Sequence, residues 1–486
     1  MGGRGRLLET AVIALAIAAR VAAVFILHNH EVPRSTYEHG AIAANLLAGR
    51  GFSIRFLGAD GPTSQQAPVY PVVVAAAYAI GGVETPRSLL ILELTQCLLG
   101  GLLAWGVIRL AGEIAPGRRG MAVAAGLLAA IHPTLVYAVT HVQVAGLGAT
   151  LLVWTMVLGY RTGSSGRIRN AALAGVGLAL LALTDPILSL AALGIAGAVV
   201  QGQGRALSTL RLLAVTLAVA LAGIAPWVMR NAGVHGEFVP IKSTFGYAFW
   251  QGNCSLSEGT DKVRRASVEG ILRRGGAGTS LGDWNRALWA ARHEAGYIDD
   301  IALTKDDKTR LGRLSEPERS RVLFRRALDE LAADPWRYPR LCLRRLGYFI
   351  LFDETNPKSR SMIYRVPHVA LTLLAAIGLA FAGRPTRKRL MPTIAVAAAV
   401  TLFHATTIVS ARFHIPLEPL MAVWGAAVLG RWPAGAVPVE GTNRSASAAG
   451  PHHIERVGVE DRLLGAELGD RRRVEVALGS GLEQRQ

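Results

Sequence analysis

Two neighbouring stretches organise the chain: YEHGAIAANLLAGRGFS, residues 37–53, and GPTSQQAPVYP, residues 61–71. The first stretch carries apolar side chains at helical spacing, namely Ile42, Leu46 and Leu47, and two glycines directly after them predict the end of the helix. Both stretches come just after the first hydrophobic segment of the chain. This order predicts an amphipathic helix that lies on the outer membrane surface and carries one acidic side chain, Glu38, near its start.

The composition indicates a membrane protein. Of the 486 residues, 51% are hydrophobic, which is too apolar for a soluble chain of this length. The formal net charge of +18 comes mainly from arginines that cluster between the apolar runs. Such clusters are typical of cytoplasmic loops that follow the positive-inside rule, and no aromatic and basic residues interleave as in single-strand nucleic-acid binders. The fold class predicted is an all-α polytopic membrane protein with no nucleic-acid partner.

The apolar runs predict ten membrane spans with both termini in the cytoplasm. These runs are residues 7–28, 88–111, 120–140, 143–160, 170–184, 187–201, 208–228, 366–383, 390–409 and 414–430. The run 69–83 is too short for a perpendicular span of ~20 residues, so it is predicted to be a juxtamembrane or re-entrant helix. If it spanned the membrane, the arginines that follow 88–111 would lie outside, against the positive-inside rule.

Four parts of the chain follow from this topology. Residues 1–229 form an N-terminal membrane core, with residues 29–87 as its first outer loop. Residues 230–345 form a small, mostly helical outer domain, because the region is too long and too patterned for a linker. Residues 346–430 complete the membrane part, and residues 431–486 form a disordered cytoplasmic tail. No internal repeat is present, which argues against the inverted-repeat architecture of secondary transporters.

A charge lies in the middle of the first predicted span. Arg20 would cost about 2.5–3.5 kcal/mol at the bilayer centre, so it should face a polar interior. Either it pairs with Glu93 for structure, or it lies near a substrate phosphate. Cys254 and Cys342 share the long polar region and could form a disulfide if that region is outside the cytoplasm. No cysteine–histidine spacing typical of a metal site is present, and we expect no bound metal.

The topology collects polar residues on the outer face: Arg34, Tyr37, Glu38, His39, Gln66, Tyr70, His141, Gln143, Asp185, Arg230, Asn231, Lys242, Arg412 and His414. This set suits the transfer of a sugar from a lipid phosphate. Arginines match the phosphate oxygens of the leaving group, and one carboxylate can take the proton of the acceptor hydroxyl. Glu38 is the best candidate for that base. The alternative is a helix-start charge that is favourable at the positive end of the helix dipole.

Four motifs together resemble the polytopic GT-C glycosyltransferases of glycosyltransferase family 39, which include protein O-mannosyltransferases and lipid A aminoarabinose transferases. They are YEHGAIAANLLAGRGFS, GPTSQQAPVYP, PWVMRNAGVHGEFVPIKSTFGYAFWQGN and ARFHIPLEP. The resemblance covers roughly residues 5–430. It implies a GT-C-type helix bundle with juxtamembrane helices in the inner (plasma) membrane, and an extracytoplasmic site. The enzyme would take its sugar from a polyprenyl phosphate, transfer it to a lipid, glycan or protein acceptor, and need no cofactor.

The resemblance also implies roles for single residues. Glu38 would be the catalytic base, Arg412 would bind the donor phosphate, and APVYP would help to build the cavity. From the outer-face set we further predict that Lys242 and Arg230 bind the donor phosphate. The cavity residues predicted from the same set are Tyr37, His39, Gln66, Tyr70, Gln143 and His414.

The chain departs from the family pattern at two places. Ser35 and Thr36 stand where an Asp-Glu pair is common, and Gln143 replaces a second acidic residue. Either Glu38 supplies the base from a shifted position, or the chain has lost turnover and acts as a lipid-linked glycan binder or a flippase.

Overall fold

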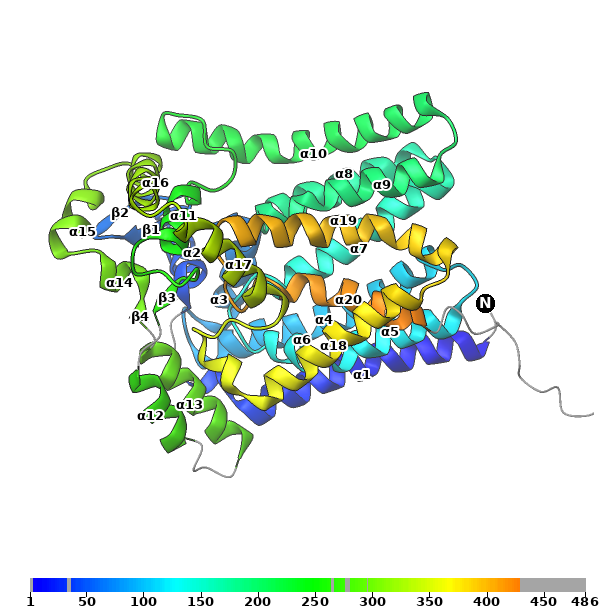
Figure 1. The fold of residues 1–486 in the computed structure, drawn as a ribbon, viewed down its shortest axis with the longest axis horizontal. Helices are drawn as coiled ribbons and strands as arrows, with labels where there is room; N and C mark the ends of the chain where they lie inside the picture. Colours follow the sequence, from blue (N-terminus) through cyan, green and yellow to red (C-terminus); the bar gives the residue numbers. More distant parts are fainter. Residues whose placement is uncertain (1–2, 33–35, 264–265, 276–279, 295, 429–486) are drawn as a thin grey trace, which may run out of the picture. The chain divides into compact units, whose positions relative to one another are not determined.

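The computed structural model describes residues 3–32, 36–263, 266–275, 280–294 and 296–428. The tail predicted over residues 431–486 and the outer-face Arg34 and Ser35 therefore lie outside the described residues. In the described part, long helices run side by side as a bundle, and shorter elements gather at one end of it (Figure 1). The first helix begins at the opposite end of the bundle (Figure 1).

Helices make up the bundle, and among the described residues α1, α4, α10, α18 and α19 are long and apolar enough to cross a membrane. The protein is thus an all-α polytopic membrane protein, as predicted. The bundle helices are α1 (Gly3–Leu27), α4 (Pro86–Ile114), α5 (Arg119–Ile131), α6 (Pro133–Ala138), α7 (Ala145–Ser165), α8 (Ile168–Ala182), α9 (Ala191–Gly202), α10 (Ala206–His235), α18 (Met362–Phe381), α19 (Arg384–Thr406) and α20 (Glu418–Ala426).

Several predicted spans differ from the helices observed. The run 120–140 is divided into α5 and α6, because Pro133 has no backbone N–H and His132 before it adopts an extended conformation (ψ 119°). The last run, 414–430, becomes helical only at Glu418. Conversely, α10 continues past residue 228 to His235. The ten-span topology stays a prediction, since α5, α8, α9 and α20 are shorter than a perpendicular span.

The elements at the end of the bundle are called the headpiece here. They are α2 (Tyr37–Leu47), β1 (Ser53–Phe56), β2 (Ala59–Pro62), α11 (Phe245–Asn253), β3 (Lys262–Val263), α12 (Ala266–Gly275), α13 (Leu281–Glu294), β4 (Gly296–Tyr297), α14 (Ile298–Ala302), α15 (Lys305–Gly312), α16 (Glu316–Ala333) and α17 (Arg337–Ile350). Strands β1 and β2 pair antiparallel through a two-residue turn, Leu57–Gly58, with positive φ at both residues. Strands β3 and β4 form a second antiparallel pair.

Short elements join the headpiece to the bundle. The apolar run 69–83 is one helix, α3 (Val69–Gly81), which packs on α2 and α4. Four 3₁₀ turns complete the connections: η1 (Asn29–Glu31), η2 (Pro186–Leu190), η3 (Pro357–Arg360) and η4 (Ile415–Leu417).

Arg20 does not pair with Glu93, which was one of its two predicted roles. Its guanidinium donates to the backbone carbonyls of Ala16, Ala129 and Ala130, while the Glu93 carboxylate contacts His30 Nδ1 at 3.0 Å. The arginine is 1% exposed, and it fits there because Gly100 on α4 presents no Cβ against its side chain. It therefore joins α1 to the end of α5 through carbonyl groups that this end of the helix leaves unpaired.

Cys254 and Cys342, for which the sequence left a disulfide open, are both free thiols in the structure. Cys254 is buried below α11, and burial raises its pKa to about 11. It is therefore an inert packing residue.

Candidate functional site

Helix α2 places Glu38 in its first turn, at the junction of headpiece and bundle. The helix ends at Leu47, and Gly49 beyond it has a φ of 73°, which confirms the predicted stop. Gly40 allows α2 to lie close to α3, because a Cβ there would overlap Thr36 and the Tyr78 hydroxyl. Tyr37 has a φ of 56°, a conformation that is costly for a non-glycine residue and is often found at functional sites.

Lys242 links Glu38 to charged residues from other segments. Lys242 lies within electrostatic range of Glu38, Asp185 and Arg412, and its Nζ donates to Gln66 Oε1 at 3.0 Å. Burial lowers the pKa of Lys242, and the two carboxylates partly oppose this shift. Burial, together with Lys242 and Arg412, lowers the pKa of His39 to about 3, so this imidazole is neutral. The structure therefore brings together four of the predicted site residues, Glu38, His39, Lys242 and Arg412.

Four cations lie near one another beside this group: Lys262, Arg292, Lys358 and Arg412. They form the cation cluster. Burial lowers the pKa of Lys358, and Arg292, Lys262 and Arg412 lower it further. Lys358 Nζ lies 4.3 Å from the Tyr137 ring centroid, and the Arg292 guanidinium lies 5.4 Å from that of Tyr37. Among the described residues, none of the four has a carboxylate within salt-bridge distance.

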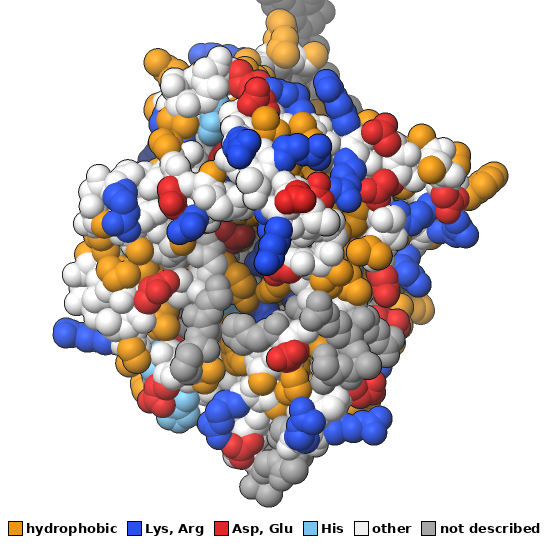
Figure 2. Space-filling model, turned by 90° about the vertical axis from the view of Figure 1, so that its left-hand side faces the viewer, with side chains coloured by type: hydrophobic (Ala, Val, Ile, Leu, Met, Phe, Trp, Pro, Cys, Tyr) orange, Lys and Arg blue, Asp and Glu red, His pale blue; other side chains and the backbone are white. Residues whose placement is uncertain are grey.

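The cations open into a polar pocket. Its walls include Arg292, Lys358 and Arg412, together with Gln143 and Tyr364. Figure 2 looks onto the headpiece end, where the surface is hollowed near its centre and a basic side chain stands at the rim of the hollow. Uncompensated cations around a polar pocket attract an anion, and arginines favour a phosphate.

An apolar groove meets the polar pocket. It has a volume of about 360 Å³ and is lined by α1, the end of α5, α6, α13 and the start of α18. Lys358, Tyr137, Thr134 and Tyr364 line both the groove and the pocket, so the two are adjacent. Alanine, isoleucine and leucine make up half of the groove lining, from bundle helices and from α13 of the headpiece, and this lining suits a hydrocarbon chain.

Two acidic residues border the cations on the headpiece side. Asp353 is 1% exposed and lies in electrostatic range of Lys262 and Asp261. Burial raises the pKa of Asp353 to about 6, although Thr355 donates to Oδ1 from both its N–H and its hydroxyl. Burial lowers the pKa of Lys262 to about 8. Asp353 and Lys262 therefore both change their protonation state close to neutral pH.

Other predicted site residues have protein partners. Arg230 donates to the carbonyls of Phe52 and Thr63 and to the side chains of Ser64 and Asn231. The Tyr70 hydroxyl donates to Gln96, and its ring contacts His39 edge-on. Gln143 donates to the Ala138 carbonyl and reaches the polar pocket. His414 is buried away from the cations, beside Tyr364 and Glu418.

Sequence reasoning missed three of the four cluster cations, Lys262, Arg292 and Lys358. They come from the polar region 230–345 and from the loop before α18, where many basic residues occur. A lysine after Asn-Pro at residues 356–357 was the one local signal, because that dipeptide predicts a turn near the membrane.

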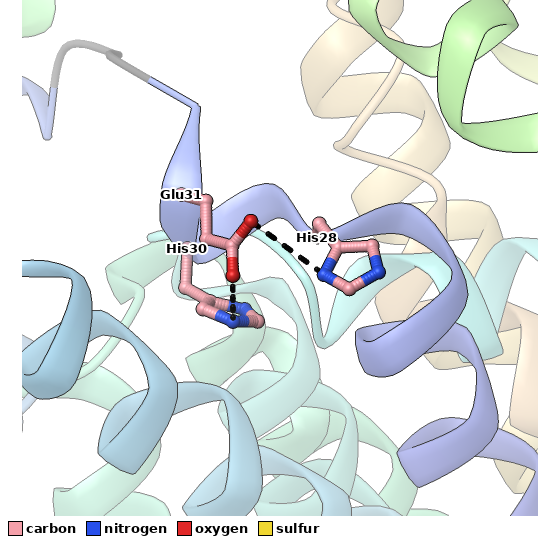
Figure 3. Close-up of side chains that lie close together, drawn as sticks. All are labelled: His28, His30 and Glu31. Carbon is pink, nitrogen blue, oxygen red and sulfur yellow. Dashed lines mark ion pairs between the residues drawn. The ribbon is translucent and has the colours of Figure 1, made fainter.

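A second cluster of polar side chains lies just after the C-terminal end of α1. Figure 3 shows the Glu31 carboxylate pointing between His28 and His30. Its oxygens lie 3.7 Å from His28 Nδ1 and 3.8 Å from His30 Nε2. His30 Nδ1 is also held by Glu93, so this group ties the loop after α1 to α4.

The chain is similar to known proteins in its three-dimensional structure. No protein-family model and no curated protein sequence matches the chain. The oligosaccharyltransferase AglB of Archaeoglobus fulgidus, solved with an inhibitory peptide and a dolichol-phosphate, matches with a TM-score of 0.52 and 16% identity over 88% of this chain and 51% of that one. ArnT of Cupriavidus metallidurans, solved with undecaprenyl phosphate, matches with a TM-score of 0.40 and 16% identity over 88% of this chain and 79% of that one. The chain spans about half the length of the archaeal protein, and it has the fold of the GT-C glycosyltransferases.

Proposed function

We propose that the protein is a membrane glycosyltransferase that moves a sugar from a polyprenyl phosphate to an acceptor hydroxyl. One observation carries this proposal: an apolar groove beside the membrane helices adjoins a pocket whose cations have no carboxylate at salt-bridge distance among the described residues. A prenyl phosphate has the matching two halves, a long hydrocarbon chain and an anionic head. The AglB structure, which has the same fold, was solved with a ligand of this chemistry, a dolichol-phosphate.

The phosphate would lie between Arg292, Lys358 and Arg412. These cations would stabilise the charge that develops on the phosphate as the sugar leaves. Lys358 stands where the groove and the pocket meet, so it would contact the phosphate at its prenyl end. Arg230 was the third predicted phosphate ligand, but its donors serve protein acceptors, and the proposal assigns it to holding the loop before α3.

Glu38 would act as the base. Its neighbours in sequence flank the cations, since Tyr37 lies over Arg292 and His39 lies in range of Arg412. The carboxylate would take the proton of the acceptor hydroxyl while that oxygen attacks the anomeric carbon. The bond between that carbon and the phosphate oxygen breaks, and the electron pair leaves with the prenyl phosphate. The prenyl phosphate is a good leaving group, so the paired acid of a glycosidase is not required.

The proposal places the site on the extracytoplasmic side of the inner (plasma) membrane, with both termini inside. The basic loops after α4, α7 and α18 lie at the end of the bundle away from the headpiece (Figure 1), as the positive-inside rule requires of the cytoplasmic side. The headpiece, rich in polar and charged helices, would select the acceptor.

The test uses the full chain in proteoliposomes with a radiolabelled prenyl-phosphate sugar and an acceptor-lipid extract. Glu38→Gln should lower sugar transfer by about 10²–10⁴-fold, because the base is lost, and should leave prenyl phosphate binding unchanged. Asp60→Asn, at an exposed carboxylate on β2, is the matched control and should transfer at the wild-type rate.

A binder or flippase is the second candidate, favoured by Gln143 in the polar pocket where the family has an acidic residue. It predicts prenyl phosphate binding without sugar release, and no effect of Glu38→Gln on any readout. Full transfer by Glu38→Gln would rule out Glu38 as the base, and absence of binding would rule out both candidates.

A further inference from the structure

Three histidines and one glutamate meet inside the bundle. His132 ends α5, His368 lies in α18, and His414 and Glu418 lie one helical turn apart at the start of α20. Their exposed fractions are 6%, 1%, 2% and 0%. The proposed transfer chemistry uses none of them.

The ring nitrogens converge on the Glu418 carboxylate. His414 Nδ1 lies 3.1 Å and His368 Nδ1 3.4 Å from Oε1, and His132 Nε2 lies 3.5 Å from Oε2. Yet all five atoms are buried without a hydrogen-bond partner, because the contacts miss hydrogen-bond geometry. Buried polar atoms without partners are costly, so such a group calls for an explanation.

A metal ion supplies that explanation. Ligands about 2.0–2.1 Å from a tetrahedral metal lie about 3.4 Å from each other. The distances from His368 and His132 to the Glu418 carboxylate, 3.4 and 3.5 Å, are close to this value. Ligand atoms of His132, His368 and Glu418 also lie within 4.8 Å of one another, near enough to share one ion.

The outer contact of His368 fits this assignment. His368 Nε2 lies 3.1 Å from the Ile350 carbonyl, and the neighbouring His414 Nε2 lies 2.7 Å from the Tyr364 hydroxyl. Because a carbonyl oxygen can only accept a hydrogen bond, Nε2 of His368 carries the hydrogen, and its Nδ1 has a lone pair that faces the cluster. Metal-bound histidines characteristically bond through their second nitrogen in this way.

We propose that His132, His368 and Glu418 bind one divalent transition metal of the Zn²⁺ class, with His414 beside the same carboxylate. Two imidazoles and one carboxylate suit zinc, and they leave a fourth coordination position for another ligand. The metal would hold the ends of α5, α18 and α20 together beneath the polar pocket, where Tyr364 is the shared neighbour. This departs from the sequence-based expectation of no metal, and it is independent of the proposed function.

The group His28, His30 and Glu31 at the end of α1 provides a matched control (Figure 3). Its atoms also lie close enough for an ion, but His28 and Glu31 are exposed and His30 Nδ1 is already held by Glu93. The proposal assigns no metal to it.

The experiment measures metal content in the full-length chain, purified in detergent from cells grown with added zinc. About one zinc per chain is expected in the wild type and in His28→Gln/Glu31→Gln, whereas His368→Gln/Glu418→Gln should lose it. Two further measurements need no variant: a membrane-permeant chelator should lower the Tm of the wild type, and Co²⁺ in place of zinc should give the visible absorption of a tetrahedral site.

Two outcomes of this experiment would contradict the proposal, each in a different part. A wild-type chain that contains no stoichiometric metal, and whose Tm changes neither with chelator nor with added zinc, overturns the proposal in favour of a protonated histidine–carboxylate cluster. Full zinc content in His368→Gln/Glu418→Gln overturns the assignment of the ligands. If that variant does not fold, the Tm and Co²⁺ measurements on the wild type decide.

Discussion

Two sets of cations in this molecule, one buried and one mostly half-buried, have opposite surroundings. Arg345 is fully buried, and its guanidinium donates to the carbonyls of Gly252 and Ala405 and to the Asn253 side chain. Arg20 is held by three carbonyls in the same manner. In the cation cluster, Arg292, Lys358 and Arg412 face aromatic rings and one another, with no carboxylate at salt-bridge distance among the described residues.

This difference in hydrogen-bond partners distinguishes the structural cations, Arg20 and Arg345, from the cations that are proposed to bind a ligand. A cation whose guanidinium donates to several protein carbonyls has few donors left for a ligand, and its burial is already compensated by the fold. Cations placed close together without a carboxylate at salt-bridge distance repel one another, and a bound anion relieves this repulsion. Strain of this kind is expected at a binding site. The following predictions test that division, beginning with the largest effect.

Removing two cluster cations should abolish tight binding of the lipid anion. Hydrogen bonds to charged groups contribute about 1.5–3 kcal/mol each, so Lys358→Met/Arg412→Met should raise the Kd for undecaprenyl phosphate by about 10²–10⁴-fold. Its Tm without ligand should stay the same or rise, since like charges are removed. Titration monitored by tryptophan fluorescence measures the Kd. The exposed Arg310→Met serves as control. An equal loss of affinity for undecaprenyl phosphate in both variants would show that the cluster cations do not bind this lipid specifically.

Removing a structural arginine should lower the stability of the fold and leave ligand binding unchanged. Arg345→Met leaves buried carbonyls without donors, which costs about 2–3 kcal/mol of stability. The Tm should fall, while the folded fraction should bind undecaprenyl phosphate as the wild type does. A normal Tm combined with weakened binding would move Arg345 into the functional set.

Binding should weaken in alkaline buffer. Burial lowers the pKa of Lys262 to about 8, so this lysine is charged below that pH and loses its charge above it. The phosphate is already fully ionised near pH 7, because its second pKa lies near 6. The Kd should therefore rise about fivefold between about pH 7 and pH 9, equivalent to about 1 kcal/mol of lost attraction. Lys262→Met should bind more weakly at about pH 7 and show a flat profile; an unchanged slope would remove Lys262 from the cluster.

The smallest effect should come from Asp353. Burial raises its folded-state pKa from 3.8 to about 6, so the folded chain holds this proton more tightly than the unfolded chain does. Stability should increase as the pH falls through about 6, and the neutral side chain in Asp353→Asn should raise the Tm at about pH 7.5. The difference between variant and wild type should close towards about pH 4. A lower Tm at about pH 7.5 would show that the charge is stabilising through Lys262.

The sequence predicted those features that depend on neighbours in the chain. The spacing of Ile42, Leu46 and Leu47 predicted α2, and the glycines after it predicted where it stops. The shortness of 69–83 predicted a helix of less than span length, which α3 confirms. The membrane class followed from composition.

Features that depend on distant residues stayed hidden. The cation cluster joins residues from the headpiece, from η3 and from the loop after α19, and no spacing in the sequence relates them. The histidine–glutamate cluster draws on His132 and His368, which are more than 200 residues apart, and only the pair His414 and Glu418 shows helical spacing. Arg230 is the opposite case. It was predicted to bind the phosphate, because nothing in the sequence showed that its guanidinium donates to backbone carbonyls of distant residues.

The adjacency of groove and pocket at Lys358 and Tyr364 would have a kinetic consequence for the proposed carrier lipid. A carrier lipid that enters sideways from the bilayer needs no exit into water, so encounter depends on its surface density rather than on bulk concentration. The spent carrier would leave by the same path and compete with the next loaded molecule. Throughput would then depend on how quickly the surrounding membrane removes the discharged lipid.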